Sequence, residues 1–133
     1  MSTEPSEQAI IKAILQDGRY PLDAYVFLRQ GLEHTTRRLG AETPDSHPGH
    51  VSGQELCVGL RELAWQRWGR LAPAVLRRWN IRTTRDFGEM VYFLISVGAM
   101  SRQESDRIED FDNVYDLRAA FDSLPIPLDE AEK

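Results

Sequence analysis

Two histidines in one polar loop have the spacing closest to that of a metal site. His47 and His50 flank a Pro-Gly pair, and Asp45 precedes them by two residues. Zinc accepts imidazole and carboxylate ligands, but its sites need three or four well-spaced ligands. We therefore predict no metal and no cofactor, and retain Asp45, His47 and His50 as the one metal candidate. The alternative is two solvent-facing histidines, with His50 fixing the loop to the helix that follows.

Nucleophilic chemistry has even less support in the sequence. The single cysteine, Cys57, shares a helical apolar stripe with Leu56, Leu60 and Leu63, which is typical of a small core residue. The chain has no glycine-rich phosphate loop with its lysine, no Gly-x-Ser-x-Gly and no His-Glu-x-x-His. We predict no catalytic residues and no enzyme activity.

The clearest chemical pattern is an arginine-rich stretch over residues 67–85. No acidic residue occurs from Leu63 to Arg85, and tryptophans are interleaved with the arginines. Guanidinium groups beside aromatic rings suit phosphates and stacked bases, although tryptophans are more often core residues than contacts. The pattern predicts an interaction surface made of Trp65, Arg67, Arg70, Arg77, Arg78, Arg82 and Arg85.

An acidic segment follows this basic stretch. Its members are Glu104, Asp106, Glu109, Asp110, Asp112 and Asp116. Nucleic-acid affinity comes largely from neutralised phosphates, so acids at this place disfavour DNA binding. Two interpretations remain: the arginines are open to a partner, or the acids fold back over them, anchored by Ile108 and Phe111.

Helical periodicity extends over most of the chain, so we expect helices to position the candidate residues named above. Apolar spacing, capping residues, prolines and glycines predict five principal helices, near residues 7–16, 21–39, 53–68, 71–79 and 84–97. Gly31 weakens the second helix, and residues 41–51 form a loop. Ser6 caps the first helix and Gly18 ends it. A capping box of Ser52 with Glu55 begins the third helix, and Thr83 or Thr84 caps the fifth, with Asp86 completing a similar box from Thr83. After Gly98 we expect a short strand at residues 99–102, in a hairpin or an irregular wing.

Length and composition give one domain over residues 1–133, with frayed tails at 1–5 and 129–133. Apolar residues make up 41% of the chain and charged residues 28%, which excludes a disordered chain. One cysteine allows no internal disulfide and fits a reducing compartment. No signal peptide and no apolar run of membrane-spanning length is found, so we predict a cytoplasmic protein without membrane contact.

Residues 54–122 resemble a winged helix-turn-helix. Two helices and a tight turn lead into an apolar helix that ends at Gly98, and residues 103–107 would form the tip of the wing. The resemblance implies that Arg82 and Arg85 flank the start of a recognition helix. It therefore favours the nucleic-acid reading of the arginine-rich stretch, against which the acidic segment stands.

Residues 19–121 also resemble a small uncharacterised bacterial family, found chiefly in planctomycetes and verrucomicrobia. The matching motifs are Arg19-Tyr20 with Ala24-Tyr25-x-Phe27, His50-Val51-Ser52-Gly53-Gln54-Glu55-Leu56 with Gly59-Leu60-Arg61-Glu62-Leu63-Ala64, Val75-Leu76-x-x-Trp79 with Thr84-x-Asp86-Phe87-Gly88, and Asp106-x-x-x-Asp110-Phe111. Because this family has no assigned activity, the resemblance implies none for the chain.

Taken together, these patterns predict a mainly α, winged-helix-like domain that acts as a non-enzymatic protein-interaction or regulatory adaptor module. Its protein partner is not specified by the sequence. The alternative is a nucleic-acid-binding protein that uses residues 67–85.

Overall fold

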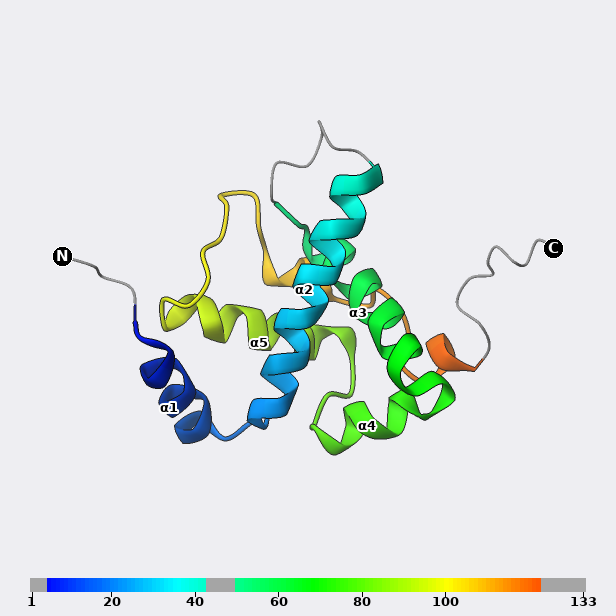
Figure 1. Cartoon of the computed structure of the whole chain (residues 1–133), viewed down its shortest axis with the longest axis horizontal. Helices are drawn as coiled ribbons and strands as arrows, with labels where there is room; N and C mark the ends of the chain where they lie inside the picture. Colours follow the sequence, from blue (N-terminus) through cyan, green and yellow to red (C-terminus); the bar gives the residue numbers. More distant parts are fainter. Residues whose placement is uncertain (1–4, 43–49, 123–133) are drawn as a thin grey trace.

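The computed structural model describes residues 5–42 and 50–122, and it confirms the mainly α architecture. The α-helices in this part of the chain are α1 (Glu7–Asp17), α2 (Leu22–Glu42), α3 (Gly53–Trp68), α4 (Ala72–Arg78) and α5 (Thr84–Ser96). Three short 3₁₀ segments accompany them: η1 (Gly69–Leu71), η2 (Ile108–Phe111) and η3 (Ala119–Phe121). Figure 1 shows α2 crossing α5, with α3 beside α2.

The predicted capping residues begin three of the helices. The Ser6 hydroxyl accepts a hydrogen bond from the Ala9 amide at 3.1 Å at the start of α1. At α3 the Ser52 hydroxyl accepts from the Glu55 amide, and the Glu55 carboxylate accepts from the Ser52 amide. At α5 the Thr83 amide donates to Asp86 at 3.1 Å. Each bond satisfies a backbone group that the first turn of a helix leaves open.

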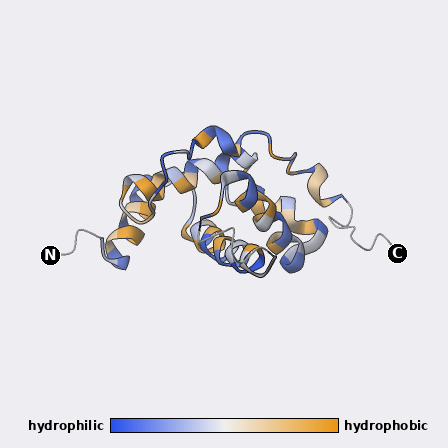
Figure 2. Ribbon diagram, turned by 90° about the horizontal axis from the view of Figure 1, so that it is seen from above, coloured by the Kyte–Doolittle hydropathy of each residue, from blue (hydrophilic) through white to orange (hydrophobic). Residues whose placement is uncertain are grey.

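Helices α2 and α3 run antiparallel and approach closely because each offers a glycine to the other (Figure 1). A Cβ atom on Gly31 would overlap the Leu60 side chain, and one on Gly59 would overlap the side chain of Thr35. Gly31 lowers helix propensity, but its lack of a side chain allows α2 to approach Leu60 of α3. Hydropathy colouring alternates along the helices, as expected for helices with one buried face (Figure 2).

Helix α5 is packed on several sides, as its apolar composition predicts. Phe87, Gly88, Met90 and Val91 are buried along it. Phe111 of η2 lies so close to α5 that a Cβ atom on Gly88 would be 2.8 Å from the Phe111 ring. The α5 helix thus holds the returning C-terminal segment.

Two of the three tryptophans lie in an aromatic cluster around buried Phe27. The ring centroid of Phe27 is 5.2 Å from that of Trp68 and 5.8 Å from that of Trp79, and the two indoles are 5.6 Å apart. Trp65 is half-buried and packs against the same core. All three therefore pack on the core, so the arginines, more than the indoles, carry the polar chemistry of the predicted surface.

Of the two forms predicted after Gly98, a hairpin and an irregular wing, the irregular one is confirmed, and the strand considered for residues 99–102 does not form. Residues 5–42 and 50–122 contain no strand, and the segment after Gly98 is irregular before it returns as η2 (Figure 1). The Ala99 and Met100 amides both donate to the Leu94 carbonyl, at 2.8 and 3.3 Å. These bonds hold the backbone against the end of α5, so these amides do not serve a strand ladder.

Other boundaries differ slightly from the prediction. Helix α2 continues through Gly40 to Glu42, so the loop begins later than expected. Residues 43–49 of that loop lie outside the described residues, as do residues 1–4 of the predicted tail at 1–5 and the whole predicted tail at 129–133. Within the described part, no helix is long and apolar enough to cross a membrane.

Candidate functional site

Five of the six predicted arginines have exposed side chains. These are Arg67, Arg70, Arg77, Arg78 and Arg82, placed from the end of α3 to the start of α5. Within residues 5–42 and 50–122, none of these guanidinium groups forms an ion pair. The sixth differs, because the Arg85 guanidinium binds both oxygens of Asp112, at 2.9 and 3.1 Å, and Glu89 at 3.3 Å.

The acidic segment therefore neutralises one end of the arginine-rich stretch only. Asp106, Asp110 and Asp116 instead accept hydrogen bonds from backbone amides two or three residues away in the chain. Glu104 and Glu109 are exposed. The interpretation in which the acids cover the arginines holds for the Arg85–Asp112 pair, while Phe111 is buried as the expected anchor.

Arg118 of the returning segment joins Arg77 and Arg82, which are close in the sequence, at one depression of about 360 Å³. Arg77, Arg82 and Arg118 line it together with the carboxylate of Asp116. That carboxylate accepts hydrogen bonds from the Arg118 and Ala119 amides, at 2.8 and 3.1 Å. Sequence reasoning missed Arg118 because it lies among acids, where no local pattern distinguishes it.

A large apolar side chain is exposed on η1, which contacts η3, the 3₁₀ segment that follows Arg118. Leu71, the last residue of η1, is 70% exposed and directly follows Arg70. We name the set made of Arg67, Arg70, Leu71, Arg77, Arg78, Arg82 and Arg118 the arginine surface. It combines cationic groups with apolar area, and such mixed surfaces are typical of protein interfaces.

The metal candidate gains no support. Asp45 and His47 lie outside the described residues, and the His50 Nε2 atom lies 3.3 Å from an oxygen of Asp106. The described residues contain no group of three or more His, Cys, Asp or Glu able to hold a metal. His50 thus contacts the acidic segment, which is distant in the sequence. The position of His50 just before the capping box gives no sign of this contact.

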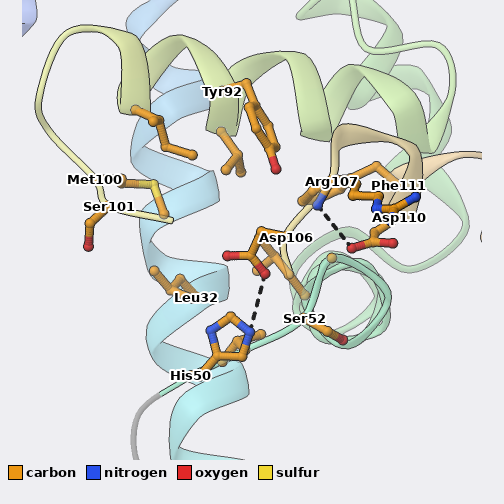
Figure 3. Close-up of a pocket in the computed structure, with 15 residues that line it drawn as sticks. Leu32, His50, Ser52, Tyr92, Met100, Ser101, Asp106, Arg107, Asp110 and Phe111 are labelled. Atoms are coloured by element: carbon orange, nitrogen blue, oxygen red, sulfur yellow. Dashed lines mark hydrogen bonds and ion pairs between the residues drawn. The ribbon is translucent and has the colours of Figure 1, made fainter. Parts of the chain in front are cut away.

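A second cavity, of about 250 Å³, lies between α2, the start of α3, α5 and the returning segment (Figure 3). Apolar side chains form much of its wall, while His50, Asp106, Arg107 and Asp110 bring charge to it. The Tyr92 hydroxyl is buried and has no hydrogen-bond partner among the described residues. Burial raises the pKa of Tyr92; the Arg102 charge opposes this shift, and Asp106 adds to it.

Cys57 is fully buried and belongs to the core, as its stripe predicts. Burial raises the pKa of its thiol to about 12, which keeps the nucleophilic thiolate negligible at neutral pH. The Tyr115 hydroxyl donates a hydrogen bond to the backbone carbonyl of Cys57 at 2.6 Å. Burial raises the pKa of Tyr115 well above its usual range.

Comparison with protein-family models, curated proteins and solved structures gives no match to this chain.

Proposed function

We propose that the protein is a non-enzymatic interaction module that binds an acidic segment of a partner protein through the arginine surface. The observation that carries this proposal is the depression lined by Arg77, Arg82 and Arg118. Three arginines line it, and the Oδ1 atom of its one acidic residue, Asp116, accepts hydrogen bonds from two backbone amides. Carboxylates of a partner would find planar cationic donors that can bind them through paired hydrogen bonds.

An acidic protein segment fits this surface better than a nucleic acid does. The exposed Leu71 side chain offers apolar contact, which a phosphate backbone does not use but an amphipathic peptide does. Nucleic-acid binding through residues 67–85 remains the second candidate, favoured by the number of exposed arginines.

Site-directed photo-crosslinking in the native host tests the proposal. A photoreactive residue replaces Leu71, and the matched control replaces Leu15, which is 63% exposed on α1. We expect a protease-sensitive adduct of defined mass from position 71 and none from position 15. A nuclease-sensitive adduct from position 71 would support the nucleic-acid candidate instead, and equal adducts from both positions would contradict a defined surface.

Charge removal then shows whether the arginines are responsible. The variant Arg77→Ala/Arg82→Ala/Arg118→Ala should lose the adduct, because the partner carboxylates lose their donors. The control variant Lys12→Ala/Arg29→Ala/Arg37→Ala removes three exposed cations from α1 and α2 and should keep it. Thermal unfolding of both variants checks that each remains folded. An adduct that survives the first variant would refute the role of the depression.

A further inference from the structure

The described part of the chain ends beside the arginine surface. The 3₁₀ segment η3 contacts η1, and its last residue, Phe121, is 1% exposed, so a buried ring anchors this end of the chain. Figure 1 shows η3, in orange, beside the turn from α3 to α4. The last described residue, Asp122, therefore lies close to the η1 segment that carries the exposed side chains of Arg70 and Leu71.

The residues that follow are first apolar and then acidic. Residues 123–133, which we name the acidic tail, lie outside the described residues and have the sequence Ser-Leu-Pro-Ile-Pro-Leu-Asp-Glu-Ala-Glu-Lys. Three acids against one lysine give the tail a net charge of −2. Its charge is opposite to that of the arginine surface, where five exposed arginines form no ion pair among the described residues.

The acidic tail is long enough to cover the arginine surface. Asp129 follows Asp122 by seven residues, and an extended chain of that length spans at most about 24 Å. The stretch from η1 to the end of α4 is shorter, about 17 Å, because helical residues rise only about 1.5–2.0 Å each. The acids can therefore reach Arg77 and Arg78 without any change in the described fold.

We propose that the acidic tail docks on the arginine surface of its own chain and competes there with the acidic segment of the partner. This inference rests on the proposed function, because both occupants use the same arginines. The carboxylates of Asp129, Glu130 and Glu132 pair with the exposed guanidinium groups. The apolar half of the tail contacts the Leu71 side chain, which is 70% exposed.

Attachment to the same chain gives the tail an advantage over a free segment of equal affinity. A short linker holds an attached group at an effective concentration in the millimolar range. Exposed ion pairs are individually weak, so the docked tail is released when a partner matches the arginine surface better. The tail thus sets the affinity that a partner segment must exceed.

A paramagnetic label on the tail tests where it lies. The full-length ¹⁵N-labelled protein carries Ala131→Cys with a nitroxide, and Cys57 is fully buried, so the label attaches at position 131 alone. We expect the amide signals of Arg70, Leu71 and Arg77 to broaden at low salt. They should recover in about 1 M NaCl, where the screening length falls to about 3 Å, while the signals of α1 stay sharp throughout.

The matched control keeps the label and removes the charge. Asp129→Asn/Glu130→Gln/Glu132→Gln leaves the length of the tail unchanged, so its broadening measures reach alone and should be weaker. Equal broadening with and without the acids would overturn the proposal. Broadening of ¹⁵N protein without a nitroxide, when it is mixed with ¹⁴N protein that carries one, would place the contact between two copies and also overturn it.

Peptide binding tests the competition. A fluorescent peptide with the sequence of residues 123–133 is titrated against the full-length protein and against the neutralised variant Asp129→Asn/Glu130→Gln/Glu132→Gln. We expect about three- to ten-fold tighter binding to the neutralised variant, because its own tail no longer occupies the arginines.

A second variant controls for the change in net charge. Glu7→Gln/Asp23→Asn/Glu33→Gln neutralises three exposed acids on α1 and α2 and should bind the peptide as the unaltered protein does. Equal affinities of this control and the neutralised variant, or no binding to the neutralised variant, would overturn the proposal.

The two proposals fail in different ways. A tail that does not dock, together with a protease-sensitive adduct from position 71, would refute the inference and leave the proposed function standing. The reverse result is a peptide that binds the neutralised variant, loses that binding when Arg77→Ala/Arg82→Ala/Arg118→Ala is added, and is not matched by any adduct from position 71. It would support docking of the tail and refute the partner.

Discussion

The Thr84 hydroxyl donates a buried hydrogen bond of 2.6 Å to the Phe111 carbonyl, which joins the first turn of α5 to the returning segment. The same oxygen accepts from the Val114 amide at 3.1 Å. One side chain thus satisfies two backbone groups on either side of the irregular residues 112–113. It gives the acidic segment a fixed course although the segment has little regular structure.

Replacement of Thr84 by valine should destabilise the domain by roughly 1–3 kcal/mol, because the near-isosteric side chain leaves both backbone groups without this partner. Urea denaturation followed by circular dichroism measures the free energy of unfolding. Thr36→Val is the control: Thr36 is exposed on α2, and the change should stay within about 0.5 kcal/mol. Equal effects at both positions would show that Thr84 does not fix the segment.

Two glycines in helices should respond to alanine in opposite directions. Gly88→Ala places a Cβ atom 2.8 Å from the Phe111 ring and should destabilise the protein by about 1–3 kcal/mol. A Cβ atom on Gly40 has nothing within 4 Å, so Gly40→Ala should stabilise by about 0.5–1 kcal/mol through helix propensity. Thermal unfolding of both variants provides the comparison. A stabilised Gly88→Ala would mean that η2 does not pack against α5 as closely as observed.

The returning segment should depend more on its apolar anchor than on its ion pair. Phe111 is 4% exposed, and Phe111→Ala should cost about 3–5 kcal/mol through lost burial and the cavity it leaves. Asp112→Asn breaks the partly exposed pair with Arg85 and should have a much smaller effect. Chemical denaturation ranks the two variants. The reverse order would show that the charge pair, and not the ring, holds the segment.

Stability should fall as the pH rises above about 9. Burial raises the pKa of the Cys57 thiol from 9.0 to about 12, and that of Tyr25 from 10.0 to about 12. A pKa raised on folding gives stability that is complete below the unfolded-state pKa and is lost as the pH rises toward the folded-state value. Urea midpoints at pH 8, 10 and 11 measure this loss.

The Tyr25→Phe variant should show a shallower decline over the same range, because one of the groups that titrates is gone. The Cys57 thiol itself should resist iodoacetamide at pH 8 until urea unfolds the chain. Rapid labelling of the native protein would contradict the burial of this residue.

Local sequence determined most of the helices, because their signals are contained in a few neighbouring residues. The capping boxes at Ser52 and Thr83, the apolar stripe around Cys57 and the stop at Gly18 all act within one or two turns. Phe111, predicted as an apolar anchor because it stands among acidic residues, is buried in the core. The strand considered for residues 99–102 does not form, because those amides bond to the end of α5 and no local pattern encodes that choice.

Only the tertiary structure decided which charges meet. The sequence alone could not say that Arg118 joins Arg77 and Arg82, that Asp106 approaches His50, or that Tyr92 faces a cavity. Each of these relationships joins residues from different elements, so it depends on how the elements pack. The reason is physical: helix formation is driven by local hydrogen bonds and side-chain spacing, whereas the position of a charge or a cavity is set by long-range burial of apolar surface.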